Sequence, residues 1–268
     1  MIARRLLLAA PALLATVAAR AQAPAAAEAT PPEDESEPRQ PPGLALPRPV
    51  RLRPGAEPLT LEASTSGWGA GGERPGLALR FSGAGAPAAQ FRFPSWYGHG
   101  RVVAVRQMRG RDVVFAAFEG STGTGTYQEI QAVIGQEDDG TARILALETL
   151  HHRLSGPCEG GTWLTIRALP LADGGGLRLD HFWRRQGENC PPRPGGPARS
   201  RAEWGTTLSW TGRGPMRVPA PLAGAPRPRR LVEASRAKVA RWLAAEPRTV
   251  VTLDDIEALG LMETIEAT

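Results

Sequence analysis

The sequence predicts an all-β fold, an antiparallel β-sandwich or barrel of about ten strands, with a short C-terminal helical extension. Two observations lead to this prediction. Between Leu59 and Thr211 the chain consists of short runs that are β-branched or alternate apolar with polar residues, and glycine-rich turns separate them. No helical periodicity lies between these runs, whereas a parallel sheet needs a helix at each crossover. The pattern therefore favours antiparallel strands and leaves open whether the sheet closes.

Each predicted strand is a run of five to nine residues bounded by turn residues. The ten runs span residues 59–64, 76–82, 89–93, 102–108, 112–119, 126–134, 142–150, 162–169, 177–184 and 204–210. The turn GSTGTG at 120–125 lies between two of them and is not followed by Gly-Lys-Ser or Gly-Lys-Thr. It is therefore predicted to be a hairpin loop rather than a phosphate-binding loop.

The first 21 residues have the pattern of a secretory signal peptide. Arg4 and Arg5 precede a short apolar run, and the small residues Ala19 and Ala21 lie just before a predicted cleavage site. We expect cleavage near Ala21 and a periplasmic or secreted mature protein, exported by the general or the twin-arginine route. A retained N-terminal anchor is the alternative, although the apolar run is shorter than the roughly 20 residues of a membrane span.

Composition divides the rest of the chain into four parts. Residues 22–58 are rich in Pro, Ala and Glu and are predicted to form a disordered linker, since they have little apolar surface to bury. Residues 59–211 form the β-rich domain, 212–230 a second linker rich in Pro and Arg, and 231–268 the C-terminal helices.

The first C-terminal helix is predicted to carry an apolar stripe. Its members are Leu231, Val232, Ser235, Val239, Trp242 and Leu243, with Arg236, Lys238 and Arg241 expected off the stripe. We expect this stripe to pack on the chain's own domain. Peripheral membrane contact through residues 229–243 is the weaker alternative. A second helix is predicted to start at Thr252, which forms a capping box with Asp255.

The charge distribution argues against nucleic-acid binding. The full chain carries +5, but three arginines leave with the signal peptide, so the mature chain carries about +2. A nucleic-acid-binding surface needs basic residues clustered among exposed aromatic side chains, and no such clustering is seen in the β-rich region.

The two cysteines, Cys158 and Cys190, bracket a predicted β-hairpin. A two-residue turn at Asp173-Gly174 places Ile166 opposite His181 and Leu164 opposite Trp183, so that the apolar side chains share one face. The same register puts Cys158 opposite Asn189, and a bulge near Gly160 would align the cysteines. We therefore predict a Cys158–Cys190 disulfide, in keeping with an oxidising compartment.

A metal site is the alternative for this histidine-rich region. His151 and His152 are adjacent, so on a strand they point to opposite faces and cannot readily share one ion. No pair of ligands has the spacing typical of zinc sites. We therefore predict no metal and no cofactor.

Four residues are candidates for ligand contact. Trp96, Tyr97 and His99 lie in the loop FRFPSWYGHG, where aromatic rings can stack on a flat or sugar-like ligand. His181 is the fourth, on the apolar face of the hairpin. The competing interpretation is a loop that covers one end of the sandwich and a core histidine.

The sequence therefore predicts a non-enzymatic binding or accessory protein of the bacterial cell envelope, with an unknown envelope ligand or partner protein. No serine-nucleophile motif is present. Two alternatives stay open. One is a hydrolase of an envelope polymer that uses dispersed carboxylates such as Glu129, Glu148 or Asp180. The other is a protein that docks a partner through its charged C-terminal helices.

Overall fold

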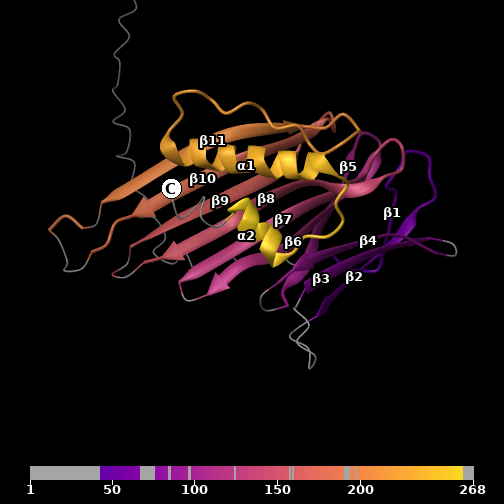
Figure 1. Cartoon of the computed structure of the whole chain (residues 1–268), viewed down its shortest axis with the longest axis horizontal. Coiled ribbons are helices and arrows are strands. Elements are labelled where there is room, and N and C mark those ends of the chain that lie inside the picture. Colours follow the sequence, from indigo (N-terminus) through magenta and orange to yellow (C-terminus); the bar gives the residue numbers. More distant parts are fainter. Residues whose placement is uncertain are drawn as a thin grey trace, which may run out of the picture. The chain divides into compact units, whose positions relative to one another are not determined.

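The computed structural model describes residues 43–66, 76–83, 86–95, 98–123, 125–156, 158, 160–189, 194–196 and 198–261. These residues form eleven antiparallel strands in two sheets and two helices (Figure 1). The all-β prediction is confirmed. The strands form a sandwich of two separate sheets rather than one closed barrel.

Both sheets follow the order of the sequence, so each strand pairs with its neighbours in the chain. The four-stranded sheet contains β1 (Arg48–Val50), β2 (Leu59–Ser66), β3 (Gly76–Gly83) and β4 (Ala86–Pro94). The seven-stranded sheet contains β5 (Gly100–Met108), β6 (Arg111–Gly123), β7 (Thr126–Gln136), β8 (Ala142–Ser155), β9 (Gly161–Pro170), β10 (Gly176–Gln186) and β11 (Arg199–Ser209). The helices are α1 (Arg227–Ala245) and α2 (Leu253–Leu259).

The predicted boundary between the first linker and the β-rich domain is wrong. Strand β1 pairs with β2, and Val50 and Leu52 are buried in the core between the sheets. The folded domain therefore begins before Leu59, because two apolar residues inside a proline-rich stretch supply enough surface to hold a short edge strand. The predicted disorder of residues 22–42 lies outside the described residues.

The β9–β10 hairpin has the predicted register. His181 lies opposite Ile166 and Trp183 opposite Leu164. The turn itself differs from the prediction, because the connection of residues 171–175 is five residues long and only Gly174 in it has a positive φ, of 67°. Its backbone nitrogen donates to the carbonyl of Leu171, at 2.9 Å. This turn is longer than the predicted two-residue turn but has the same centre, so the register is unchanged. In the longer turn Asp173 does not need the left-handed conformation that the two-residue turn would require.

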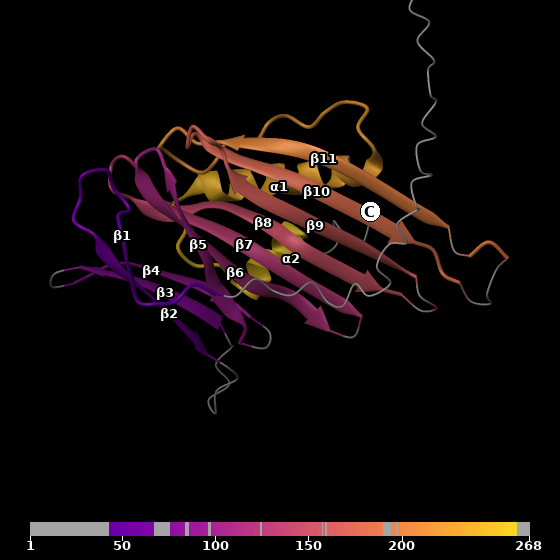
Figure 2. The ribbon, with the colours of Figure 1, turned by 180° about the vertical axis from the view of Figure 1, so that it is seen from behind.

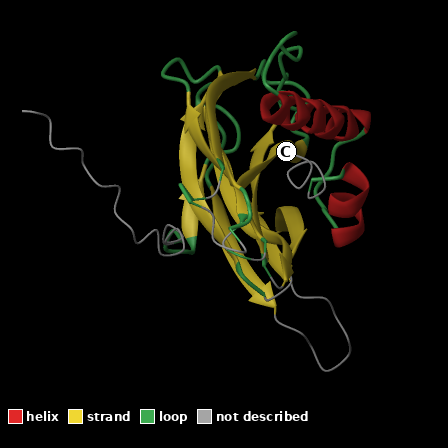
Figure 3. Ribbon diagram, turned by 90° about the vertical axis from the view of Figure 1, so that its left-hand side faces the viewer, coloured by secondary structure: helices red, strands yellow, loops and turns green. Residues whose placement is uncertain are grey.

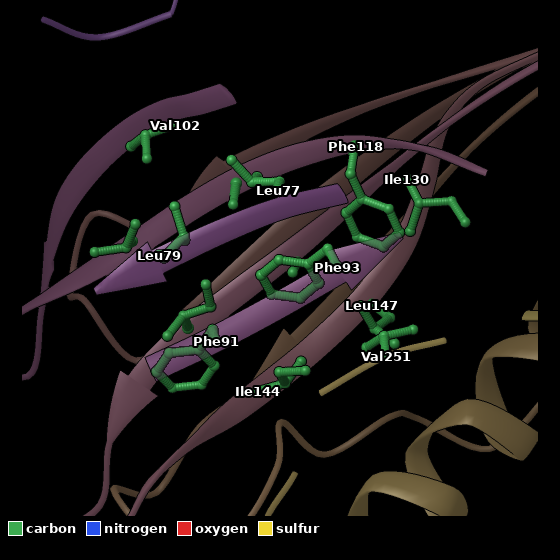
Figure 4. Close-up of a cluster of buried hydrophobic side chains, with 14 of the residues drawn as sticks. Leu77, Leu79, Phe91, Phe93, Val102, Phe118, Ile130, Ile144, Leu147 and Val251 are labelled. Atoms are coloured by element: carbon green, nitrogen blue, oxygen red, sulfur yellow. The ribbon is translucent and has the colours of Figure 1, made fainter. Parts of the chain in front are cut away.

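The main hydrophobic core lies between the sheets and continues under the helices (Figure 4). Alternate residues of β3, β4, β6 and β7 supply it, as the strand period of two requires. Phe93 and Phe118 stack across the two sheets, with ring centroids 4.9 Å apart. Ile144 and Leu147 of β8 complete this layer together with Val251 from the C-terminal segment.

Both helices lie on one side of the strands (Figure 3), and Figure 2 shows the opposite face of the seven-stranded sheet with the helices behind it. The predicted stripe of α1 is confirmed at Val232, Val239 and Leu243, which are buried against the domain. The position of Arg236 is a correction: it is 4 % exposed and lies inside the contact with the sheet. Its charge is matched there by a buried glutamate, which sequence periodicity does not reveal.

The ends of the helices are held by polar contacts. Arg143 of β8 donates to the carbonyls of Leu243 and Glu246, so it caps the last turn of α1 from the sheet. The predicted capping box of α2 is confirmed, with the Thr252 hydroxyl accepting from the Asp255 nitrogen at 3.1 Å. Neither helix in the described part of the chain has the length and apolar character needed to cross a membrane.

The segment before α1 is hydrogen-bonded to the large sheet through its backbone. Met216 donates to the carbonyl of Leu145 in β8, at 2.8 Å, and Arg217 pairs with Ser209 at the end of β11. The helix starts at Arg227, four residues before the predicted start, with Pro226 at the N-cap and Pro228 inside the first turn. Proline suits the first turn because the nitrogen there has no helical acceptor.

Candidate functional site

A row of polar residues crosses four neighbouring strands of the large sheet. Glu119 of β6 is the cross-strand partner of Glu129 in β7, Glu129 of His151 in β8, and His151 of Thr165 in β9. Cross-strand partners share a face of a sheet. Since Ile130, next to Glu129, faces the core between the sheets, this row lies on the opposite face, the one toward the viewer in Figure 2. We call these four residues the carboxylate row.

The two glutamates of the carboxylate row are buried, at 5 % and 6 % exposure. The Arg101 guanidinium of β5 contacts the Glu129 carboxylate, with Nη2 and Oε1 2.5 Å apart. The Ser95 hydroxyl donates to Oε2 of Glu119, at 3.0 Å. Burying two carboxylates side by side costs free energy, since each has lost water and each repels the other.

Burial raises the pKa of Glu129, and the neighbouring Glu119 adds to this effect while Arg101 opposes it. Glu129 therefore retains its proton to a higher pH than an isolated glutamate does. Burial, together with Arg153 and Arg184, lowers the pKa of His151, so its ring is neutral at pH 7. Its Nδ1 lies 3.2 Å from the Thr165 hydroxyl, and no described residue is a partner for its Nε2.

The structure shows none of the sequence-predicted ligand residues in contact with the carboxylate row among the residues that it describes, but it does place the neighbouring Ser95 there. Ser95, which donates to Glu119, is immediately followed by Trp96 and Tyr97, which lie outside the described residues. His99 is described and exposed. The contributions of Ser95, Glu119 and Arg101 were missed by the sequence analysis, because only the three-dimensional register brings them together.

A second buried polar cluster lies under α1. Arg236 binds Glu148 of β8 with two nitrogens, at 2.5 and 3.1 Å, and its Nη2 also lies 2.6 Å from Nε2 of His181 in β10. Both charged side chains are almost fully buried. We call these three residues the helix clasp, since they join α1 to two strands.

The proposed ligand role of His181 does not fit its position in the helix clasp. Its Nδ1 lies 3.1 Å from the carbonyl of Trp204, which can only accept, so Nδ1 carries the proton and Nε2 accepts from Arg236. Burial and Arg236 lower its pKa to about 3. The ring also stacks on Trp204, with centroids 4.7 Å apart. His181 is thus a fully engaged core residue.

The remaining candidates are placed apart from one another. Asp180 pairs with Arg178 at the surface, at 2.8 Å. His151 and His152 face opposite sides of β8, as predicted, and His152 is fully buried with its pKa lowered to about 4 by burial. Among the described residues, no three His, Cys, Asp or Glu side chains are grouped so that they could hold a metal ion.

The cysteine pair is described only in part. Cys158 is half-buried, and its carbonyl accepts from the backbone nitrogen of Asn189 at 3.0 Å, which is the predicted alignment. Cys190 lies outside the described residues. The disulfide therefore stays a prediction, and no register shift separates β9 from β10 within their paired residues.

Two small hollows lie beside the helix clasp, of about 20 and 10 Å³. The larger is lined by Glu148, Thr149 and Arg236 among others and has room for about one water molecule. In comparisons with protein families, curated proteins and solved structures, nothing matches this chain. Its function is therefore argued from the geometry of the two clusters.

Proposed function

We propose that this chain is an exported, non-enzymatic binding or accessory protein of the bacterial cell envelope, and that the carboxylate row is its ligand site. The observation that carries the proposal is the buried pair Glu119–Glu129 on the sheet face away from the core. Such a pair costs stability where it stands, and groups of this kind concentrate at functional sites.

The chemistry of the row favours a hydroxyl-rich ligand such as an envelope glycan. Two carboxylates accept hydrogen bonds from sugar hydroxyls. Arg101 and the Nε2 of His151, which has no partner among the described residues, complement ring oxygens and further hydroxyls. The aromatic pair Trp96 and Tyr97 follows Ser95 in the sequence, and such rings can stack on sugars.

Sedimentation with purified peptidoglycan and with lipopolysaccharide tests this proposal. The mature chain is expected to sediment with one of these polymers, and Glu129→Gln is expected to weaken binding at least tenfold. Glu203→Gln, at an exposed position of β11, is the matched control and should bind like the wild type. Equal binding by Glu129→Gln, or no binding to either polymer by the wild type, would contradict the proposal.

A retaining glycoside hydrolase is the second candidate, and the register of the pair favours it. Cβ atoms of directly opposite residues are about 4.5–5.5 Å apart, and retaining enzymes hold their two carboxyl groups about 5–5.5 Å apart. The raised pKa of Glu129 suits the acid role in that mechanism. Release of new reducing ends from peptidoglycan, lost in both Glu119→Gln and Glu129→Gln, would establish this function instead.

The Cys158–Cys190 disulfide is part of the proposal, as a brace for the hairpin in an oxidising compartment. The contact between Asn189 and Cys158 supports it. Closing a loop of about 33 residues stabilises a fold by roughly 3–4 kcal/mol through the entropy of the unfolded chain. We expect no alkylation of the exported protein without reductant, and a lower free energy of unfolding after reduction. Free reaction of both thiols would contradict the disulfide.

A further inference from the structure

A surface groove runs along the outer side of α1. One wall is the segment 213–221, and the other is the helix face that carries Ala237, Ala240 and Ala244. The groove has a volume of about 630 Å³. Contiguous apolar surface with a charged rim is typical of sites for protein partners.

The walls of this groove are fixed before any partner binds. The segment is joined to β8 and β11 through Met216 and Arg217, and the indole of Trp210 donates to the carbonyl of Gly214 at 3.1 Å. At its far end, the backbone nitrogen of Leu222 donates to Glu233 of α1, at 3.1 Å. A preformed groove loses little conformational entropy on binding.

The charges at the rim are of one sign. Among the described residues that line the groove, the charged ones are Arg213, Arg217 and Arg241. Arg217 and Arg241 form no ion pair with a described residue, and Arg213 lies 4.0 Å from Asp138 as its described partner. This field favours an acidic partner.

The shape of the groove favours a helix over an extended peptide. Pro215, Pro219 and Pro221 have no N–H group, so the exposed wall cannot pair with an added strand along its length. The alanines of α1 lie three and four residues apart, which lets a second helix approach closely.

A membrane surface fits this groove less well. The apolar stripe of α1, including Val232 and Val239, is buried in the domain rather than presented outward. A membrane-surface helix needs that stripe on the outside. We propose that the groove docks an acidic amphipathic helix of a partner protein, a role separate from the carboxylate row.

Fluorescence anisotropy with a labelled 16-residue peptide of Ala, Leu and Glu, which forms an acidic amphipathic helix, tests the proposal. The mature chain is expected to bind it, and to bind a scrambled peptide of the same composition at least tenfold more weakly. The double variant Arg217→Glu/Arg241→Glu should lose at least tenfold in affinity. The filling variant Ala240→Trp should show a similar loss, with folding of both variants checked by circular dichroism.

A matched double charge reversal separates the groove from general electrostatics. Arg201→Glu/Arg227→Glu changes two exposed arginines outside the groove and should bind within twofold of the wild type. Glu129→Gln should also bind normally, so failure of the glycan proposal does not affect this test. Absence of peptide binding, equal loss in both double variants, arginine-dependent binding to phosphatidylglycerol vesicles without peptide binding, or dimer formation abolished by Ala240→Trp would overturn the proposal.

Discussion

The helix clasp and the two glutamates of the carboxylate row are both buried and polar, but their charges are arranged differently. In the helix clasp, the Arg236 guanidinium meets one carboxylate and one neutral imidazole. In the carboxylate row, two carboxylates lie opposite each other, with Arg101 contacting one and Ser95 the other. The helix clasp thus pairs opposite charges, whereas the carboxylate row holds two groups of like charge side by side, and like charges repel each other.

If the carboxylate row is the ligand site that we propose, this difference separates a cluster that serves the fold from one that serves a ligand. Proteins retain locally unfavourable groups where function requires them and stabilise the fold elsewhere. This contrast would not hold if the helix clasp were dispensable for folding. It would also not hold if the carboxylate row were required for folding.

The largest expected effect comes from breaking the helix clasp. Arg236→Met leaves Glu148 buried without its counter-ion and should lower the free energy of unfolding by about 3–5 kcal/mol. Urea denaturation of the two proteins measures this. Arg241→Met, on the exposed side of α1, is the control and should change stability by less than about 0.5 kcal/mol.

The double variant Arg236→Met/Glu148→Leu sharpens that result. Removing both charges leaves no unpaired ion, so the double variant should be more stable than Arg236→Met alone. A double variant that loses the sum of both single effects would show that the ion pair does not act as a unit.

The next effect is a loss of stability in acid. The pKa of His181 is about 3 in the folded chain and about 6.5 in the unfolded chain, so the unfolded state binds the extra proton between these values. Stability from this residue is therefore complete above pH 6.5 and falls by about 1.4 kcal/mol per unit as the pH decreases toward 3. Denaturation at pH 7 and pH 5 should differ by roughly 2 kcal/mol from His181, with His152 adding to the loss.

The variant His181→Gln tests the assignment of that slope. It removes the titrating group, so stability should depend less on pH between 6.5 and 5 whatever its value at pH 7. An unchanged slope would mean that other groups cause the acid sensitivity.

The smallest effect is expected in the carboxylate row. Glu129→Gln removes one buried negative charge and the repulsion from Glu119, while its amide oxygen still accepts from Arg101. Unfolding free energy should stay within about 1 kcal/mol of the wild type even though glycan binding is lost. A loss above about 2 kcal/mol would place the row among the structural contacts and remove the contrast with the helix clasp.

The sequence alone predicts where the strands lie, and it predicts the complete pairing register of the β9–β10 hairpin. All ten predicted strands are present, because each is a short β-branched or alternating run bounded by turn residues. In the β9–β10 hairpin, Asp173-Gly174 fixes the centre and the apolar face fixes the pairing, so His181 could be placed opposite Ile166 in advance. Strand β1 was not predicted because it has only three residues, one of them a proline, and such a short run shows no alternation of apolar and polar residues.

The candidate site could not be predicted in the same way. The pairing of β6 with β7 shifts between Glu119 and Thr122, and this irregularity is what brings Glu119 opposite Glu129. A regular hairpin through the same turn pairs Thr122 with Tyr127 and would place Glu119 opposite Ile130. Arg236 was missed for another reason: its burial depends on Glu148, 88 residues earlier in the chain.

Both helices follow all the described strands in the sequence, and this order has a consequence for how the protein folds. Every strand of the large sheet pairs with its neighbour in sequence, so the sheet can assemble as the chain emerges. The helices that cover the apolar side chains of β8–β10 arrive last. Until the helices fold onto it, this apolar face is exposed to solvent, and incompletely folded chains can aggregate through it. Folding of α1 and α2 onto the sheet therefore protects the chain from aggregation.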